Sequence, residues 1–188
     1  LYRRAAIEER IQDGYPVYEV SPKSENPHKA RILYLHGGAF VFEILDIHWN
    51  VAAELAEGLN AIVTVPIYPL GPEHKLGEMY DFLMPVQDDV ARQAQRENVP
   101  FLMVGDSCGG SMALVLTQKA LAAGKRMGKG IAERIVLTTP VVDSSCANPD
   151  MRAAAPKDPF HDMPGFEEIL RTVCEGMDPK DPVVSPLY

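Results

Sequence analysis

Residues 105–110 read Gly-Asp-Ser-Cys-Gly-Gly, and they stand between a short apolar run and a longer apolar segment. The run Phe101-Leu102-Met103-Val104 predicts a buried strand, and residues 109–123 predict a buried helix because they are apolar nearly all round. A G-x-S-x-G turn between a strand and a helix is typical of a nucleophile elbow, in which the hydroxyl stands clear of the sheet. We therefore predict that Ser107 is a nucleophile. The alternative is a glycine-rich turn with a solvent-facing serine.

A second glycine turn follows another predicted strand, Ile32-Leu33-Tyr34-Leu35, and it reads His36-Gly37-Gly38-Ala39-Phe40. Adjacent glycines let the backbone approach a substrate carbonyl and direct N–H groups at it. Each such donor lowers the barrier of acyl transfer by roughly 3 kcal/mol. The alternative is a tight turn with a structural histidine. The two turns together predict an oxyanion loop beside a nucleophile.

The rest of the chain alternates short apolar runs with helical patterns, which predicts an α/β fold with a mostly parallel sheet. Residues 62–65 and 135–137 predict strands buried on both faces, and residues 16–20 predict an antiparallel edge strand. Residues 148–164 predict a loop. Three helices are predicted from apolar side chains at helical spacing. They carry Val51, Ala52, Leu55, Ala56 and Leu59; then Met79, Leu83, Val86, Val90 and Ala94, with Pro85 at a start or kink; then Phe166, Ile169, Leu170 and Val173.

Composition excludes several classes of protein. The 188 residues, 46% of them hydrophobic, suit a single domain over 1–188. A net charge of −8 argues against nucleic acid as a partner, because phosphate binding needs a basic face. The sequence has no apolar run of about 18 residues that could span a membrane and no visible signal peptide. Its three cysteines form no C-x-x-C pair, so we expect no disulfide framework and a cytoplasmic location. His and Asp are scattered without ligand spacing, so we expect no metal, and we expect no cofactor.

The two glycine turns and two further stretches resemble the hormone-sensitive-lipase-like branch of the α/β-hydrolases. That branch has HGG and GDSAGG motifs at the positions of the two turns. Residues 68–74 (YPLGPEH) and 181–187 (DPVVSPL) are similar to its Y-x-L-A-P-E-H and D-P-x-x-S-P-L stretches. The resemblance covers roughly Arg31 to the end of the chain. It implies an α/β-hydrolase fold with helices on both faces of the sheet, and hydrolysis of small-molecule carboxylic esters without a metal.

The resemblance also assigns roles to residues of both turns. Ser107 is the nucleophile, and the oxyanion donors are the backbone N–H groups of Gly38, Ala39 and Cys108, with Gly37 shaping the loop. Ala39 stands where a third glycine is commoner, and Cys108 stands where alanine is commoner. Both act through the backbone, so the thiol of Cys108 is assigned to packing. The supporting motif residues are His36, Gly105, Asp106, Gly109 and Gly110.

A serine nucleophile also needs a base and an acid that orients the base. The resemblance places both beyond Tyr188, so the domain is expected to be incomplete at its C-terminal end. A longer product or a second polypeptide would complete the sheet and the triad. Within the chain, His161 is the only formal candidate for a base. Asp143 is an alternative acid, unless it is a polar cap on a strand end.

The predicted function is that of a serine carboxylesterase, and a homo-oligomer is left open. The rival is a catalytically inactive α/β-hydrolase that binds small molecules as a receptor. A complete elbow and oxyanion loop favour the enzyme. The resemblance places the substrate-covering lid largely in residues that precede the first strands.

Overall fold

The computed structural model describes residues 5–24, 26–158 and 163–188. Six strands form its main sheet in the order β1-β2-β4-β3-β5-β8. They are β1 (Ala5–Gln12), β2 (Tyr15–Pro22), β3 (Ala30–Leu35), β4 (Ala61–Pro66), β5 (Phe101–Asp106) and β8 (Arg134–Thr138). From β4 to β8 neighbouring strands are parallel, whereas β2 runs antiparallel to β1 and β4. The mostly parallel sheet predicted from the sequence is confirmed.

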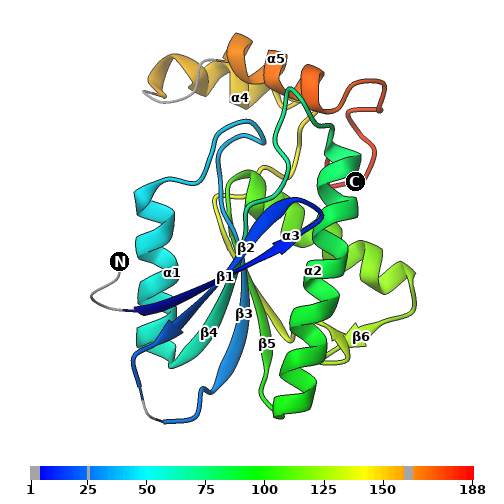
Figure 1. Ribbon diagram of the computed structural model, residues 1–188. Helices are drawn as coiled ribbons and strands as arrows, with labels where there is room; N and C mark the ends of the chain where they lie inside the picture. The colour runs from blue at the N-terminus through cyan, green and yellow to red at the C-terminus, as the bar shows by residue number, and fades with distance from the viewer. Residues whose placement is uncertain (1–4, 25, 159–162) are drawn as a thin grey trace.

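Helices cover both faces of this sheet (Figure 1). One face carries α1 (Asp46–Leu59), and the other carries α2 (Leu76–Glu97) and α3 (Cys108–Ala122). Side chains alternate along β3, so Ile32 packs in the α1 layer and Leu33 packs in the α2–α3 layer. The small strands β6 (Arg126–Met127) and β7 (Gly130–Ile131) follow α3. No helix in the described ranges is long and apolar enough to cross a bilayer.

Short helices lie above the carboxyl ends of the parallel strands (Figure 1). They are α4 (Pro149–Ala154), the 3-10 turn η1 (Ala155–Lys157) and α5 (Met163–Val173). The prediction of a loop over 148–164 is therefore wrong in part. The Asn148 side chain accepts the Asp150 N–H (2.9 Å) and Pro149 occupies the first turn, so this segment begins with a capped helix.

The antiparallel strand predicted at 16–20 is present as β2, but it is not an edge. β1 pairs along its whole length on the outer side. The charged residues of β1, including Glu8 and Glu9, hid it from the sequence pattern. Charged side chains suit an edge strand because they oppose pairing with another chain.

Two helix predictions also need correction. The residues that α1 buries against the sheet are Ala52, Ala53 and Ala56, because their small side chains let the helix approach closely. Ala52 and Ala56 belong to the predicted stripe, and Leu55 is half-buried against the same core cluster. Val51 and Leu59, however, are 38% and 50% exposed and face outward. The second helix already begins at Leu76, so Pro85 does not start it.

Within the described residues, β8 ends the sheet and pairs with β5 alone. Burial on both faces was predicted for this strand, but Val136 is 55% exposed. Val136 stands in register with Val104, whose side chain belongs to the α1 layer, and α1 packs mainly on β4, β2 and β1 rather than on β8. The expected unpaired edge is confirmed.

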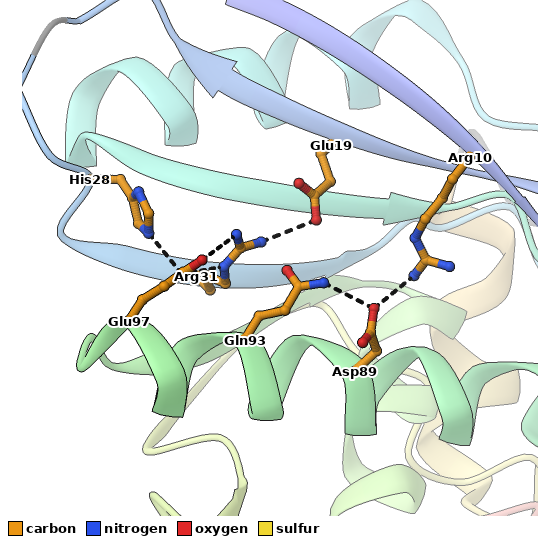
Figure 2. A network of polar contacts seen from close by, with 7 residues as sticks. All are labelled: Arg10, Glu19, His28, Arg31, Asp89, Gln93 and Glu97. Carbon is orange, nitrogen blue, oxygen red and sulfur yellow. Dashed lines mark hydrogen bonds and ion pairs between the residues drawn. The ribbon is translucent and has the colours of Figure 1, made fainter.

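A network of charges ties β2, β3 and α2 together at the amino end of β3 (Figure 2). Arg31 donates to both carboxylate oxygens of Glu97, at 2.6 and 2.8 Å, and to Glu19 at 3.0 Å. His28 Nε2 lies 2.9 Å from Glu97 Oε2. The Arg31 side chain is 7% exposed, so it needs these partners. Asp89 contacts Arg10 and Gln93 nearby, and both groups lie away from the two glycine turns.

Candidate active site

Ser107 lies in the tight turn between β5 and α3. Its backbone angles are φ 51° and ψ −122°, a region that costs a residue other than glycine about 1–3 kcal/mol. Backbone hydrogen bonds on both sides of the residue hold this conformation. The Ser107 N–H donates to the Thr138 carbonyl (2.9 Å), and the Ser107 carbonyl accepts from Gly110 (3.1 Å) and Val141 (3.2 Å). The serine is thus fixed in a strained turn at the N-terminus of a largely buried helix, the geometry predicted for a nucleophile elbow.

The glycines around Ser107 are needed because strand, turn and helix touch there. A Cβ on Gly105 would lie 2.5 Å from the Gly109 carbonyl oxygen. A Cβ on Gly109 would overlap the Leu35 carbonyl oxygen at the end of β3. Neither position has room for a Cβ atom, so the two glycines of the G-x-S-x-G motif are required by close backbone packing.

The predicted oxyanion loop lies against this elbow. The Gly37 N–H donates to Asp106 Oδ2 (2.9 Å), and the Phe40 N–H donates to the Cys108 sulfur (3.3 Å). Asp106 and Cys108 are the two residues that flank Ser107, so the structure brings together the two turns that the sequence singled out. Between the two contacts, the loop turns through left-handed backbone angles, with φ +136° at Gly38 and +52° at Ala39.

Asp106 connects the elbow to further polar groups that the sequence motifs did not indicate. Its Oδ1 accepts the Tyr34 hydroxyl (2.8 Å), and its Oδ2 lies 3.6 Å from His48 Nε2. His48 is in the first turn of α1, where its Nδ1 accepts the Leu45 N–H (3.0 Å). Burial and the Asp106 carboxylate both raise the pKa of Tyr34, so it stays a neutral donor. The pairing of β3 with β5 is the signal that could have indicated Tyr34. Tyr34 lies opposite Val104, and Asp106 is two residues further along β5, so both side chains lie on the same face of the sheet.

His36 supports the loop rather than acting as a base. It is 1% exposed, and its ring stacks on Tyr68 with centroids 4.6 Å apart. Its Nδ1 donates to the Gly37 carbonyl (2.6 Å), while the Tyr68 hydroxyl donates to the His36 carbonyl (2.7 Å). Burial lowers the pKa of His36 to about 4, so the ring is neutral near pH 7.

Ser107 and Ala39 line a cavity of about 440 Å³. The segment that follows β8 forms one wall, and α4, η1 and α5 form another. The apolar side chains of these walls are Pro140, Val141, Val142, Met151, Ala154, Ala155, Met163 and Phe166. The resemblance places the lid before the first strands, but this wall comes from residues after β8. The cavity size and lining suit a small apolar ligand.

The sequence of this chain is similar to those of known proteins. A model of the family described as the alpha/beta hydrolase fold matches residues 32–188. The chain belongs to this family. Similar members include an esterase of Acinetobacter venetianus, 28% identical over 158 residues, and an ethyl acetate hydrolase of Pseudomonas putida, 32% identical over 149 residues. These alignments cover 84% and 75% of this α/β-hydrolase chain, but 50% and 46% of the two relatives. The chain spans about half the length of the curated relatives it matches.

Solved structures show the same relation to this α/β-hydrolase. EstE7, a hormone-sensitive-lipase homologue from a metagenome library, superposes with a TM-score of 0.82 at 22% identity. An esterase/lipase from an uncultured bacterium superposes with a TM-score of 0.79 at 24% identity. They cover 98% and 97% of this chain, which in turn covers 61% and 59% of theirs. At such identities the likeness concerns the fold, and the fold predicted from the sequence is confirmed.

Of the two residues considered as base and acid within this α/β-hydrolase chain, the described ranges contain Asp143. Asp143 lines the cavity with Ser107, and its Oδ1 accepts the N–H of Ser145 (2.9 Å) and the Ser145 hydroxyl. These contacts suit a cap on the turn after β8. His161 lies outside the described residues. Over residues 5–24, 26–158 and 163–188, no group of three or more His, Cys, Asp or Glu side chains could hold a metal ion.

The last motif of the chain braces the segment that follows β8. The Ser185 hydroxyl donates to the Pro179 carbonyl (2.6 Å) and accepts the Ser144 N–H (2.8 Å). The Leu187 N–H donates to the Val142 carbonyl (3.0 Å). The DPVVSPL stretch therefore supports one wall of the cavity that Ser107 lines.

Proposed function

We propose that this chain carries the nucleophile and the oxyanion loop of a carboxylic-ester hydrolase. The observation that carries the proposal is Ser107 itself, in a strained elbow that opens on an apolar cavity beside the glycine loop. The esterase of A. venetianus and the ethyl acetate hydrolase of P. putida are relatives whose names support this class of reaction.

The chemistry follows from the two turns. The Ser107 hydroxyl oxygen attacks the ester carbonyl carbon while a base takes its proton. The backbone N–H groups of Gly38, Ala39 and Cys108 stabilise the negative charge that develops on the carbonyl oxygen. When the tetrahedral intermediate collapses, the alcohol leaves with the proton and an acyl-serine remains. Water then attacks the acyl-serine by the same route, which releases the carboxylic acid.

The base and its acid are proposed to come from sequence outside residues 1–188. The chain spans about half the length of its relatives, and among the described strands β8 is the last of the sheet and has an exposed apolar side chain. A downstream segment, or a second polypeptide, would pair with β8 and bring a histidine and a carboxylate to Ser107. The substrate is proposed to be a small-molecule ester whose acyl group enters the apolar cavity. All three cysteines are free and buried, which supports a reducing compartment, the cytoplasm.

The test is labelling of the protein with its downstream sequence by an organophosphonate ester probe. We expect one labelled residue, Ser107, and a loss of about 10³-fold or more in p-nitrophenyl acetate hydrolysis for Ser107→Ala. Ser111→Ala is the matched control, because this hydroxyl lies one turn further along α3 and donates to the Val141 carbonyl. Its probe label should remain on Ser107. Labelling that survives Ser107→Ala would contradict the proposal, and an unlabelled, inactive protein would favour a receptor.

A further inference from the structure

The Cys108 thiol makes contacts that packing alone does not explain. The residue is fully buried, and its sulfur accepts the Phe40 N–H at 3.3 Å. The same sulfur lies 4.0 Å from the His36 carbonyl oxygen, to which it can donate. One side chain at the start of α3 therefore contacts both ends of the loop 36–40.

The contact with Phe40 occurs where the loop backbone is most constrained. Phe40 has φ +65° and Ala39 has φ +52°, and neither is glycine. Phe40 is 2% exposed, so its N–H would lose its hydrogen-bond partner if the sulfur were removed. Such left-handed conformations persist only where surrounding contacts hold them.

A second contact holds the other side of the same turn. Gly37 donates its N–H to Asp106, the residue that precedes Ser107. Gly38 and Ala39, two of the predicted oxyanion donors, thus lie between two hydrogen bonds that both end on the nucleophile elbow. Loss of either bond leaves the donors free to shift relative to Ser107, and a stabilising N–H must be placed within a few tenths of an ångström.

We propose that the thiol of Cys108 is a positioning residue, which holds the oxyanion loop in register with Ser107 by accepting the Phe40 N–H. This inference rests on the proposed esterase function. It gives the side chain a role in addition to the backbone N–H that the sequence assigned to this position.

The ionisation of the thiol agrees with that role. Burial raises the pKa of Cys108 to about 11, although the Phe40 N–H, the Tyr68 hydroxyl and the Ala39 N–H oppose this rise. At neutral pH the group is a thiol that accepts through its sulfur lone pairs. It is not a thiolate that would compete with Ser107 as a nucleophile.

The test compares three substitutions of Cys108 in the protein with its downstream sequence. Cys108→Ala removes the acceptor, and we expect kcat for p-nitrophenyl butyrate to fall about tenfold with KM changed less than about twofold. Cys108→Ser supplies a hydroxyl acceptor and should recover kcat to within about threefold of the unmodified protein. Cys108→Val fills the space without an acceptor and should stay as slow as Cys108→Ala. The matched control is Cys174→Ala, which removes another buried free thiol and should leave kcat unchanged.

A transition-state analogue provides a readout that a packing defect would not move. A trifluoromethyl ketone forms a tetrahedral adduct with the serine, so its inhibition constant should rise by the same factor by which kcat/KM falls. Thermal midpoints should stay within a few degrees across the series. The inference is overturned if Cys108→Ala keeps full turnover, if Val restores turnover and Ser does not, or if activity falls only in step with thermal stability. Retained activity in Ser107→Ala would instead overturn the proposed function, so the two failures are distinguishable.

Discussion

At the scale of single residues, the site depends on positions where only a hydrogen fits. A Cβ on Gly109 would overlap the Leu35 carbonyl oxygen, whereas a Cβ on Gly58, which is also helical, would meet nothing within 4 Å. We expect Gly109→Ala to lower the unfolding free energy by several kcal/mol, because two rigid backbones would have to separate. Gly58→Ala should raise it by about 0.5–1 kcal/mol, because alanine is the better helix former. Urea unfolding of the two variants measures the contrast, and equal effects would contradict the packing argument.

At the scale of elements, the charge network at the amino end of β3 makes stability depend on pH. The Arg31 guanidinium holds the pKa of Glu97 at about 2, below the value of about 4.3 expected in the unfolded chain. Above pH 4.3 the carboxylate is ionised in both states and its stabilisation is complete. Between about pH 4.3 and 2 the unfolded chain takes up the proton first, so this stabilisation is lost as the pH falls.

Arg31→Met should therefore destabilise the fold more at pH 7 than at pH 3, as measured by urea midpoints at the two pH values. Arg92→Met is the control, because Arg92 is 61% exposed in its pair with Asp89 and should matter little at either pH. If Arg31→Met lowers the urea midpoint by the same amount at both pH values, then packing of the arginine, not its charge, stabilises these elements.

The elements differ in how far the sequence could predict them. The strand before Ser107 and the stripe of α2 were predictable because apolar periodicity fixes them locally. β1 was not predictable, because its charged residues Glu8 and Glu9 break the apolar pattern of a strand. They suit an edge strand, and β1 becomes one only by pairing with β2. The same distinction applies within the site. The motifs pointed to Ser107 and the glycines, whereas the contacts of the Tyr34 hydroxyl and the Cys108 sulfur depend on residues that only the folded chain brings together.

At the scale of the whole molecule, apolar surface remains open at the β8 edge. Val136 is 55% exposed there, and Leu121 of α3 is 52% exposed. We expect the 188-residue chain expressed alone to aggregate and to lack esterase activity. The downstream region, added in the same chain or as a separate one, should restore solubility and activity together.

Val136→Lys separates loss of solubility from loss of activity. A charge on the edge strand should keep the isolated chain in solution, but it does not supply a base. Size-exclusion chromatography and p-nitrophenyl butyrate hydrolysis are the measurements. A monomeric and fully active 188-residue chain would show that the base lies within it, and His161 with Asp143 would then be the pair to substitute.

The hydrogen bond from the Ser107 N–H to the Thr138 carbonyl joins the turn before α3 to the last residue of the edge strand. The exchange rate of the Ser107 amide proton should therefore report on the opening of β8. We expect that a segment paired with this edge would suppress fraying of β8 and raise the protection of this amide against exchange with solvent. Pairing of the sheet edge and the backbone geometry of Ser107 should thus depend on the same local opening equilibrium.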